Sequence, residues 1–295
     1  MNAAAASVAV LYYPAKAGAA EVAARLAAEI PPITAGVARA LSLRDLNPAA
    51  LRGHELAVVV GGDGSILGAA RLCAPLGIPL LPVQLGRLGQ LAEVEAHEVA
   101  TTLPLYLRGE CWRDERLMLA AEVERGPDDG ETEVEGAAET LALNDIVVAR
   151  GVSSGPIRVD VTFGDWDYGT VWADGVIVAT PTGSSAYTRS AGGPIIHPAT
   201  PSLAVTAIAP QSGPPSLLVI AADESVTLRV TTDAPTWVLL ADGLVHALPA
   251  SGARVTVKRA PDDAVFLRRG DRYRLQRRLR ELLIGDPRPR LGLSG

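Results

Sequence analysis

The 295-residue chain has little of what disulfide scaffolds, zinc modules and membrane proteins are built from. Its two cysteines, Cys73 and Cys111, cannot form a framework of bridges and have no metal-ligand spacing, so we expect two reduced thiols. Glycine or proline interrupts every apolar stretch before it reaches the roughly 18 residues of a membrane span. The N-terminal residues lack the basic start of a signal peptide. These absences predict a cytoplasmic protein with no membrane partner.

An excess of positive charge is absent too. The formal net charge is −6, which argues against nucleic acid as a bulk electrostatic partner. The four histidines are scattered and match no metal spacing. A content of 48% hydrophobic and 20% charged residues is typical of an ordered globular chain, and the length is enough for one large domain or two ordinary ones.

The first part of the chain alternates strand-like and helix-like segments. Apolar runs predict strands at 7–13, 56–60 and 78–83, and apolar spacing predicts helices at 19–30 and 65–76. Strand–loop–helix units of this length imply parallel strands joined by right-handed crossovers. We therefore predict an α/β domain with a parallel sheet over residues 1–110.

The pattern changes near Cys111, after which apolar and polar residues alternate in short runs separated by turns. The expected strands are 116–123, 139–148, 157–163, 168–172, 176–179, 203–209, 225–230, 237–241 and 254–257. Most of their connections are too short for helical crossovers, so we predict a second domain, an antiparallel β-sandwich, over residues 111–265. Segment 272–284 again has helical spacing, and we expect this C-terminal helix to return to the first domain, which residues 266–295 complete.

A glycine-rich block, Gly61-Gly62-Asp63-Gly64-Ser65, follows the predicted strand 56–60 and opens the next helix. Backbone N–H groups at such a turn, with the positive end of the helix, suit phosphate oxygens. Glycine lets a phosphate approach because it has no Cβ. The block matches neither the Rossmann fingerprint nor a Walker loop.

Asp63 is the unusual residue of this block. A carboxylate beside a phosphate site is repelled unless it binds a metal ion or accepts a proton from an attacking hydroxyl. Both roles belong to phosphoryl transfer. The alternative is a tight turn in which Asp63 caps the following helix, and the pentapeptide alone does not decide between them.

A second block extends from Asp174 to Pro194 and contains Thr-Pro-Thr-Gly-Ser-Ser-Ala-Tyr at 180–187. Hydroxyl groups and small residues crowd the turn that follows the predicted strand 176–179. A purely structural loop has little need of so many small polar residues. They would let a polar ligand lie against the backbone.

Together the two blocks resemble those of the NAD kinase family, which phosphorylates the adenosine-ribose 2′-hydroxyl of NAD to make NADP. The resemblance covers nearly the whole chain. Its further landmarks are Leu85-Gly86-Arg87-Leu88-Gly89, Leu143-Asn144-Asp145 and Arg278-Leu279-Arg280. The first block also occurs in lipid kinases and phosphofructokinases, whereas the second is far more specific.

The resemblance implies a phosphate loop with a catalytic carboxylate. Asp63 would be the base or orienting acceptor for the ribose hydroxyl and would lie close to Mg²⁺ or another divalent metal. Gly62, Gly64 and Ser65 would face phosphates. ATP would be the phosphoryl donor, and inorganic polyphosphate stays open as a second one.

The resemblance also implies the residues that hold NAD between the two domains. Asn144 and Asp145 would bind ribose hydroxyls and neighbouring groups, and Asp174 would help to hold the nicotinamide end. The residues that would line the dinucleotide pocket are Ser185, Ala186, Tyr187 and Ser190. Taken singly, Asn144 and Asp145 also suit turn formers, and Tyr187 suits a half-buried sheet aromatic.

Four positions depart from the family pattern. Gln84 and Gln90 stand where the family usually has Asn and Phe, and Gln211 and Leu244 replace a His and a Gln. Without the aromatic at Gln90, a stacking contact near the adenine, worth about 0.5–1.5 kcal/mol, would be missing. These departures bear on NAD affinity and selectivity more than on reaction type.

The family further implies a homodimer or homotetramer. Two alternatives stay open at this point. One is a kinase of the same phosphate-loop superfamily that acts on a lipid or sugar. The other is a non-catalytic paralogue that binds NAD or NADP, motivated by Gln84, Gln90 and Leu244.

Overall fold

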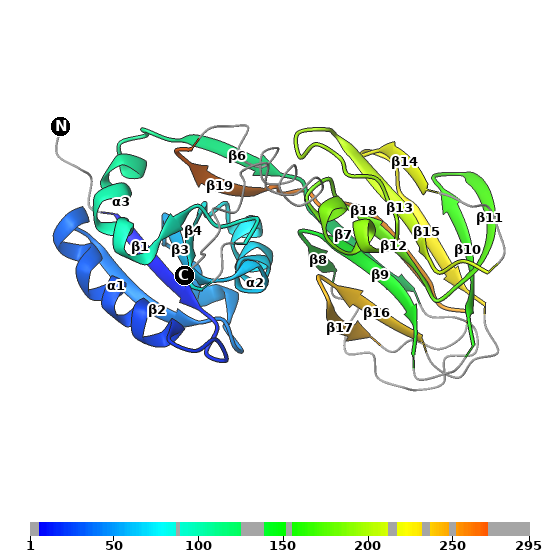
Figure 1. The fold of residues 1–295 in the computed structure, drawn as a ribbon, viewed down its shortest axis with the longest axis horizontal. Coiled ribbons are helices and arrows are strands. Elements are labelled where there is room, and N and C mark those ends of the chain that lie inside the picture. The colour runs from blue at the N-terminus through cyan, green and yellow to red at the C-terminus, as the bar shows by residue number, and fades with distance from the viewer. Residues whose placement is uncertain are drawn as a thin grey trace, which may run out of the picture. The chain divides into compact units, whose positions relative to one another are not determined.

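The computed structural model of the protein describes residues 6–86, 89–124, 139–151, 155–211, 217–231, 237–247 and 252–270. The fold divides into two units (Figure 1). The first is drawn from Met1–Ile66, Pro79–Asp114 and Phe266–Gly295, and the second from Leu67–Ile78 and Glu115–Val265. Among the helices in the described ranges, none is long and apolar enough to cross a membrane.

The first unit is built on a mostly parallel sheet. Its strands are β1 (Ser7–Tyr12), β2 (Val37–Ser42), β3 (Leu56–Gly61), β4 (Leu80–Gln84), β5 (Val94–Glu95), β6 (Trp112–Arg116) and β19 (Ala264–Arg268). They lie in the order β2-β1-β3-β4-β19-β6, and β5 pairs with β4 off this path. The pairs of β1 with β2 and β3, and of β4 with β3, β5 and β19, are parallel, which confirms the predicted α/β class.

Helices α1 (Ala19–Thr34) and α3 (Val99–Leu107) belong to this unit, and α2 (Asp63–Cys73) begins in it and continues into the second. Helix α1 packs on β1, β2 and α3 and buries Ala23, Leu26 and Ile30. It continues past the predicted end, through Pro31 and Pro32. The two prolines have no N–H to donate, and the Thr34 hydroxyl adds a hydrogen bond to the Ile30 carbonyl (3.2 Å) in this turn.

The strands described in the second unit form two sheets. They are β7 (Leu119–Glu124), β8 (Thr140–Ala142), β9 (Asp145–Arg150), β10 (Ile157–Phe163), β11 (Trp166–Ala173), β12 (Gly175–Ala179), β13 (Ser202–Ile208), β14 (Leu217–Ala221), β15 (Val226–Val230), β16 (Trp237–Ala241), β17 (Leu244–Ala247) and β18 (Arg254–Arg259). One sheet has the order β11-β10-β15-β18-β7-β8 and the other β14-β13-β12-β9-β16-β17. All the pairings described within them are antiparallel.

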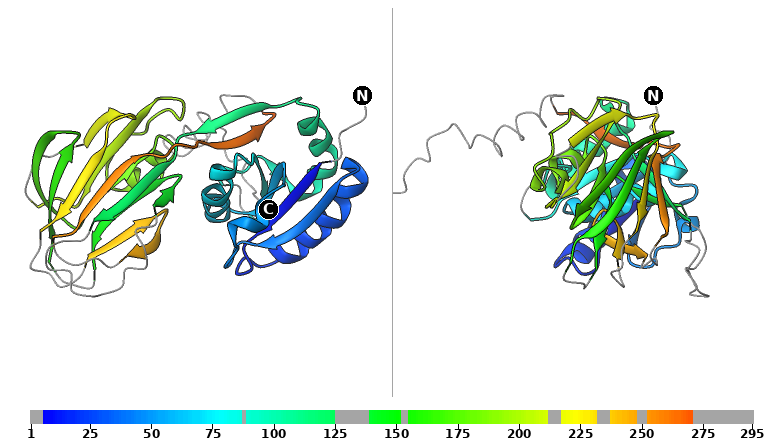
Figure 2. Two further views of the ribbon diagram at one scale, coloured as in Figure 1. Left: turned by 180° about the vertical axis from the view of Figure 1, so that it is seen from behind. Right: turned by 90° about the vertical axis from the view of Figure 1, so that its right-hand side faces the viewer.

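The two sheets face each other (Figures 1 and 2), and buried hydrophobic side chains from both form one core cluster. Alternate residues of β10 point into it, and the largest side chain in it, that of Trp237, is fully buried. Alternation of this kind is how two antiparallel sheets form a sandwich. The predicted β-sandwich is therefore confirmed.

Several elements differ from the sequence predictions. The run predicted over 139–148 is two strands, β8 and β9, because the turn between them is bound by another segment, as described below. Of the elements named above, strands β2, β5, β6, β14, β17 and β19 and helix α3 were not predicted; β2 is a half-exposed edge strand without an apolar run. The helix predicted at 272–284 lies outside the described residues.

Candidate active site

The first candidate element is the turn from β3 into α2. All six residues of β3 are buried, and α2 begins at Asp63 directly after Gly62. The Gly62 carbonyl accepts the N–H groups of Ser65 (3.0 Å) and Ile66 (3.2 Å), which closes the first helical turn. Helix α2 thus starts at the carboxyl end of a central parallel strand, where α/β folds bind their ligands.

The glycines of this turn differ in what surrounds them. A Cβ on Gly61 would collide with the Ser65 side chain, so Gly61 is required by the packing of the protein itself. A Cβ on Gly62 or Gly64 would meet nothing within 4 Å, and neither residue has a positive φ. The fold itself therefore does not need glycine at 62 and 64, whereas a phosphate lying close to the backbone would.

The Asp63 carboxylate is held by a neighbouring loop. Its Oδ2 accepts the Gln90 N–H (3.0 Å) and its Oδ1 accepts the Leu91 N–H (3.1 Å). A Cβ on Gly89 would overlap this carboxylate, so glycine is needed there. Each carboxylate oxygen keeps a second lone pair, and Asp63 is half-buried, so the oriented group still has capacity to accept a proton or a hydrogen bond.

One cationic residue that the sequence analysis did not select lies at the same sheet edge. Lys16 follows β1, and its Nζ is 3.7 Å from the place of a Cβ on Gly86, in the loop after β4. Strands β1, β3 and β4 are neighbours in the sheet, so the loops at their carboxyl ends meet. The position of Lys16 after the first parallel strand is a signal that could have found it.

The second candidate element, in the β-sandwich unit, is the turn Leu143-Asn144-Asp145 between β8 and β9. The Asp242 carboxylate accepts all three of its N–H groups: Oδ2 from Leu143 (3.1 Å), and Oδ1 from Asn144 (2.7 Å) and Asp145 (3.3 Å). Arg71, from the part of α2 that belongs to this unit, donates through Nη1 to Asp242 Oδ2 and to the Ala241 carbonyl, both at 3.3 Å.

Asp242 can reach this turn because of its own backbone. It has a φ of 49° and is followed by Gly243 with a φ of 78°, which together form the tight hairpin turn between β16 and β17. From the sequence, only Leu244 in this turn stood out, as a departure from the family pattern. The Asp-Gly pair between two strand-like runs is the signal that could have identified the turn.

Asp145 and Asp242 form a buried acidic pair. Burial, and after it the charge of the neighbouring Asp242, raise the pKa of Asp145 to about 7. Burial also raises the pKa of Asp242, while the three backbone N–H groups and Arg71 act against that shift. Asp145 is therefore a carboxyl group that changes charge near neutral pH, a property that is typical of ligand sites.

The block Thr180–Ser185 closes over this turn. Thr180 donates through Oγ1 to the Leu143 carbonyl (2.6 Å), and its N–H donates to the Asn144 carbonyl (2.9 Å). A Cβ on Gly183 would overlap the backbone of Asn144, so this approach requires glycine. The structure thus brings Asn144 and Asp145 together with the start of the second sequence block.

The remaining residues of that block present small groups. The Ser185 hydroxyl donates to the Thr182 carbonyl (3.0 Å), and the Ser190 hydroxyl donates to the Ala186 carbonyl (3.4 Å). Ala186 is half-buried, and Tyr187, the first residue of α4 (Tyr187–Ser190), is 43% exposed. Tyr187 is therefore not a sheet aromatic, and its ring is accessible to a ligand.

The structure does not place Asp174 beside Asn144, Asp145 and the Thr180–Ser185 block. It precedes β12, whereas Thr180 follows this strand, and the register places Gly175 opposite Ala149 but Ala179 opposite Asp145. At roughly 3.3 Å per residue, Asp174 and Ala179 are about 16 Å apart along the strand. The Asp174 carboxylate instead pairs with Arg150 Nε (3.0 Å).

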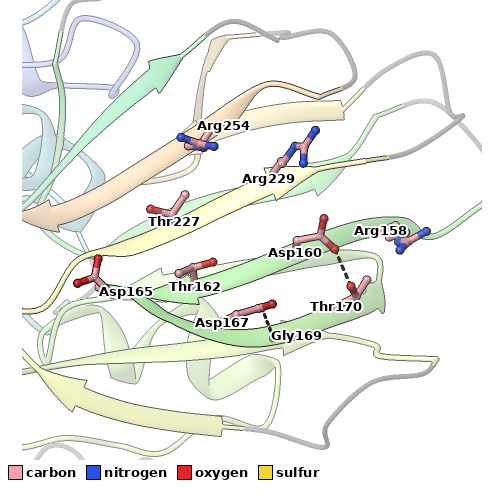
Figure 3. Close-up of a pocket in the computed structure, with 11 residues that line it drawn as sticks. Arg158, Asp160, Thr162, Asp165, Asp167, Gly169, Thr170, Thr227, Arg229 and Arg254 are labelled. Atoms are coloured by element: carbon pink, nitrogen blue, oxygen red, sulfur yellow. Dashed lines mark hydrogen bonds between the residues drawn. The ribbon is translucent and has the colours of Figure 1, made fainter. Parts of the chain in front are cut away.

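A hollow of about 700 Å³ lies elsewhere, on the outer face of the sheet that contains β10, β11, β15 and β18 (Figure 3). It is lined by both signs of charge, and Asp160 accepts a hydrogen bond from Thr170 there (2.6 Å). None of the predicted site residues lines it. Its mixed charge is that of a solvated sheet face.

Known proteins resemble the chain along both units. Residues 15–111 match the family model of the ATP-NAD kinase N-terminal domain, and residues 143–269 match that of the C-terminal domain. The NAD kinase of Heliobacterium modesticaldum is 40% identical over 222 residues, which are 75% of this chain and 76% of that protein. The NAD kinase of Caldanaerobacter subterraneus subsp. tengcongensis is 36% identical over 222 residues, 74% and 71% of the two chains.

Solved structures share the fold. The structure of yeast NADH kinase complexed with NADH has a TM-score of 0.81 at 20% identity and covers 99% of this chain and 91% of its own. The structure of an NAD kinase from Archaeoglobus fulgidus in complex with ATP has a TM-score of 0.70 at 22% identity, with coverage of 92% and 96%. With both family models matched and a relative at 40% identity over three quarters of each chain, the chain belongs to the NAD kinase family.

Proposed function

We propose that this enzyme transfers the γ-phosphoryl group of ATP to the 2′-hydroxyl of the adenosine ribose of NAD, giving NADP and ADP, and that Asp63 is its catalytic carboxylate. The observation that carries the proposal is the Asp63 carboxylate, fixed by two backbone amides directly beside two glycines whose Cβ positions are open. This combination suits an acceptor hydroxyl next to a phosphate. Its family membership supports the same reaction.

In this mechanism Gly62, Gly64 and Ser65 bind phosphate oxygens at the start of α2, where the helix end favours negative charge. The 2′-hydroxyl oxygen forms the new bond to the γ-phosphorus as the bond from that phosphorus to the β,γ-bridging oxygen breaks. The hydroxyl proton passes to Asp63. Because the transition state of phosphoryl transfer is loose, Asp63 mainly orients the hydroxyl and takes its proton late.

The residues of this turn fit a magnesium ion bound mainly through substrate. Within the described ranges no three His, Cys, Asp or Glu side chains gather into a metal-binding group. Mg²⁺ bound with nucleotides needs only one or two carboxylates in addition to phosphate oxygens, and Asp63 supplies one. When bound, the ion would neutralise charge on the transferring phosphoryl group.

For NAD recognition we propose the turn of Asn144 and Asp145 as the acceptor of ribose hydroxyls, together with Tyr187, Ser185, Ala186 and Ser190 along the dinucleotide. The rigid support of the turn by Asp242 and Thr180 favours this role, because a fixed polar pair binds hydroxyls without an ordering cost. Asp174 as a contact for the nicotinamide end stays a prediction. We also propose that the protein is cytoplasmic and forms a homodimer or homotetramer. Light scattering of the purified protein would measure the mass of the oligomer.

The direct test compares NADP formation from ATP and NAD by the wild type, Asp63→Asn and a control, Asp223→Asn, which changes an exposed turn residue. We expect kcat to fall at least about 100-fold in Asp63→Asn, the size of a lost general base, while the dissociation constant for NAD stays within about threefold. The control keeps wild-type kcat. Turnover of Asp63→Asn near that of the wild type would remove the assigned role.

A panel of acceptors separates this reaction from those of related kinases. NAD, NADH, a diacylglycerol and a sphingoid base are each offered with radiolabelled ATP. We expect label in the dinucleotides and none in the lipids. The comparisons do not favour the lipid or sugar kinase or the non-catalytic paralogue, since both units match NAD kinases.

A further inference from the structure

A buried arginine lies behind the loop that holds Asp63. Arg268 is the last residue of β19, and its side chain is only 8% exposed. Its Nη1 donates to the Leu91 carbonyl (2.6 Å), across 177 positions of the sequence. The N–H of the same residue, Leu91, donates to Asp63 Oδ1. Leu91 is therefore held at one end by Arg268 and holds Asp63 at the other.

The guanidinium is itself fixed from several sides. Its Nε donates to Asp114 Oδ2 (3.2 Å), the Glu93 carboxylate is 3.9 Å from Nη1, and the ring centroid of Phe266 is 5.0 Å from Cζ. A planar guanidinium with its donors engaged in fixed directions has little freedom to rotate. A hydrogen bond from a charged donor is also stronger than one from a neutral donor. The Leu91 carbonyl is thus bound to a rigid group.

We infer that Arg268 is a positioning residue for Asp63, which acts through Leu91 and does not touch substrate. The inference rests on the proposed role of Asp63. It assigns a function to the return of the chain into the first unit, because β19 is the strand that brings Arg268 to the loop. Misplacement of a reacting group by about 1 Å can cost up to about 100-fold in rate, so even a small shift of this loop is expected to slow turnover.

The test is a double-mutant cycle with Asp63→Asn. Arg268→Lys keeps a buried cation beside Asp114, but an ammonium group cannot reproduce the two directed contacts of the fork. We expect kcat to fall about tenfold in Arg268→Lys with the KM values for NAD and ATP within about twofold, and to fall further in Arg268→Gln. In the Asp63→Asn background, Arg268→Lys should change the residual kcat by less than twofold. Arg259→Gln, at an exposed arginine on β18, is the control that keeps wild-type kinetics.

A second readout does not depend on activity. Hydrogen exchange at the amides of residues 89–93 should become faster in Arg268→Lys, while exchange in β10 and β13 stays unchanged. In Arg268→Gln a global loss of stability would speed exchange in β10 and β13 as well, so faster exchange confined to residues 89–93 is the result that reports on the loop.

The outcomes distinguish the inference from the proposed function. An equal fold-loss from Arg268→Lys in both backgrounds, or unchanged exchange at 89–93, would overturn the positioning role and leave Asp63 in place. Wild-type turnover by Asp63→Asn alone would overturn the proposed function and with it this inference.

Discussion

Asp63 and Asp242 both accept backbone N–H groups from a distant segment, but they do so in opposite surroundings. Asp63 is half-buried and takes one amide on each oxygen, so that it keeps accepting capacity toward open space. The Asp242 side chain is fully buried and takes three amides and a guanidinium. We propose that the same residue type serves an incoming substrate at Asp63, whereas Asp242 holds backbone. The number of partners and the exposure separate the two roles.

We expect Asp242→Ala to lower the free energy of unfolding more than any other substitution proposed here. It takes the acceptor away from three backbone N–H groups and removes one of the two acceptors of Arg71 Nη1, and breaking such a network around a buried carboxylate costs on the order of 3–5 kcal/mol of the free energy of unfolding. Urea unfolding measures this loss. Asp223→Ala, at an exposed aspartate, is the matched control and should stay within about 0.5 kcal/mol of the wild type.

The variants Asp242→Asn and Asp63→Asn test the difference between the two carboxylates more finely. Asp242→Asn should be clearly less stable than Asp63→Asn, because the Asp242 side chain is fully buried and accepts three N–H groups and a guanidinium, whereas Asp63 is half-buried and accepts two N–H groups. Equal losses of stability from the two variants would contradict the division of roles.

We expect the free energy of unfolding to depend on pH through Asp145. The pKa of Asp145 is raised to about 7 in the folded protein, so this protein binds a proton there more tightly than the unfolded chain does. The contribution to stability is therefore complete below about pH 4 and is lost as the pH rises toward 7, with a slope that approaches about 1.4 kcal/mol per pH unit. Unfolding free energies at pH 5 to 8 should fall with pH in the wild type relative to Asp145→Asn. Parallel curves for the two proteins would show that Asp145 is ionised across this range.

We expect Gly64→Ala to have the smallest effect on the free energy of unfolding. A Cβ at this position meets nothing in the protein, and alanine is the better helix former by up to about 1 kcal/mol, so stability should stay the same or rise slightly. The KM for ATP should nevertheless rise severalfold, because the methyl group occupies the space of a phosphate. Gly183→Ala is the contrast, since its Cβ collides with Asn144 and must destabilise. An unchanged KM in Gly64→Ala would favour a plain helix start at this turn.

Sequence patterns were enough for the fold class because both halves have strong periodic signals. The continuous apolar run of β3 and the alternation of β10 predict buried and half-buried strands directly. The edge strand β2 escaped prediction because it buries little and so carries no apolar pattern. Helix α1 was predicted too short because the apolar spacing ends at Ile30, whereas the helix continues through Pro31 and Pro32.

The candidate site was only partly predictable, for a different reason. Asp63, Asn144 and Asp145 stand in motifs, but their supports come from far along the chain. Leu91 meets Asp63 through its N–H, which no side-chain pattern encodes, and Arg268 and Asp242 lie 177 and 98 positions from the residues they hold. Such contacts depend on the tertiary fold. Asp174 shows the converse, since a motif residue next to the block in sequence lies at the other end of β12.

The most direct test of the account is a crystal structure of this protein with NAD bound, read for the distance between the Asp63 carboxylate and the 2′-oxygen of the adenosine ribose. We predict that one carboxylate oxygen lies about 2.6–3.2 Å from that hydroxyl, the reach of a general base. A bound NAD whose adenosine ribose lies far from Asp63, in a complex that still forms NADP, would contradict the assignment of the catalytic carboxylate.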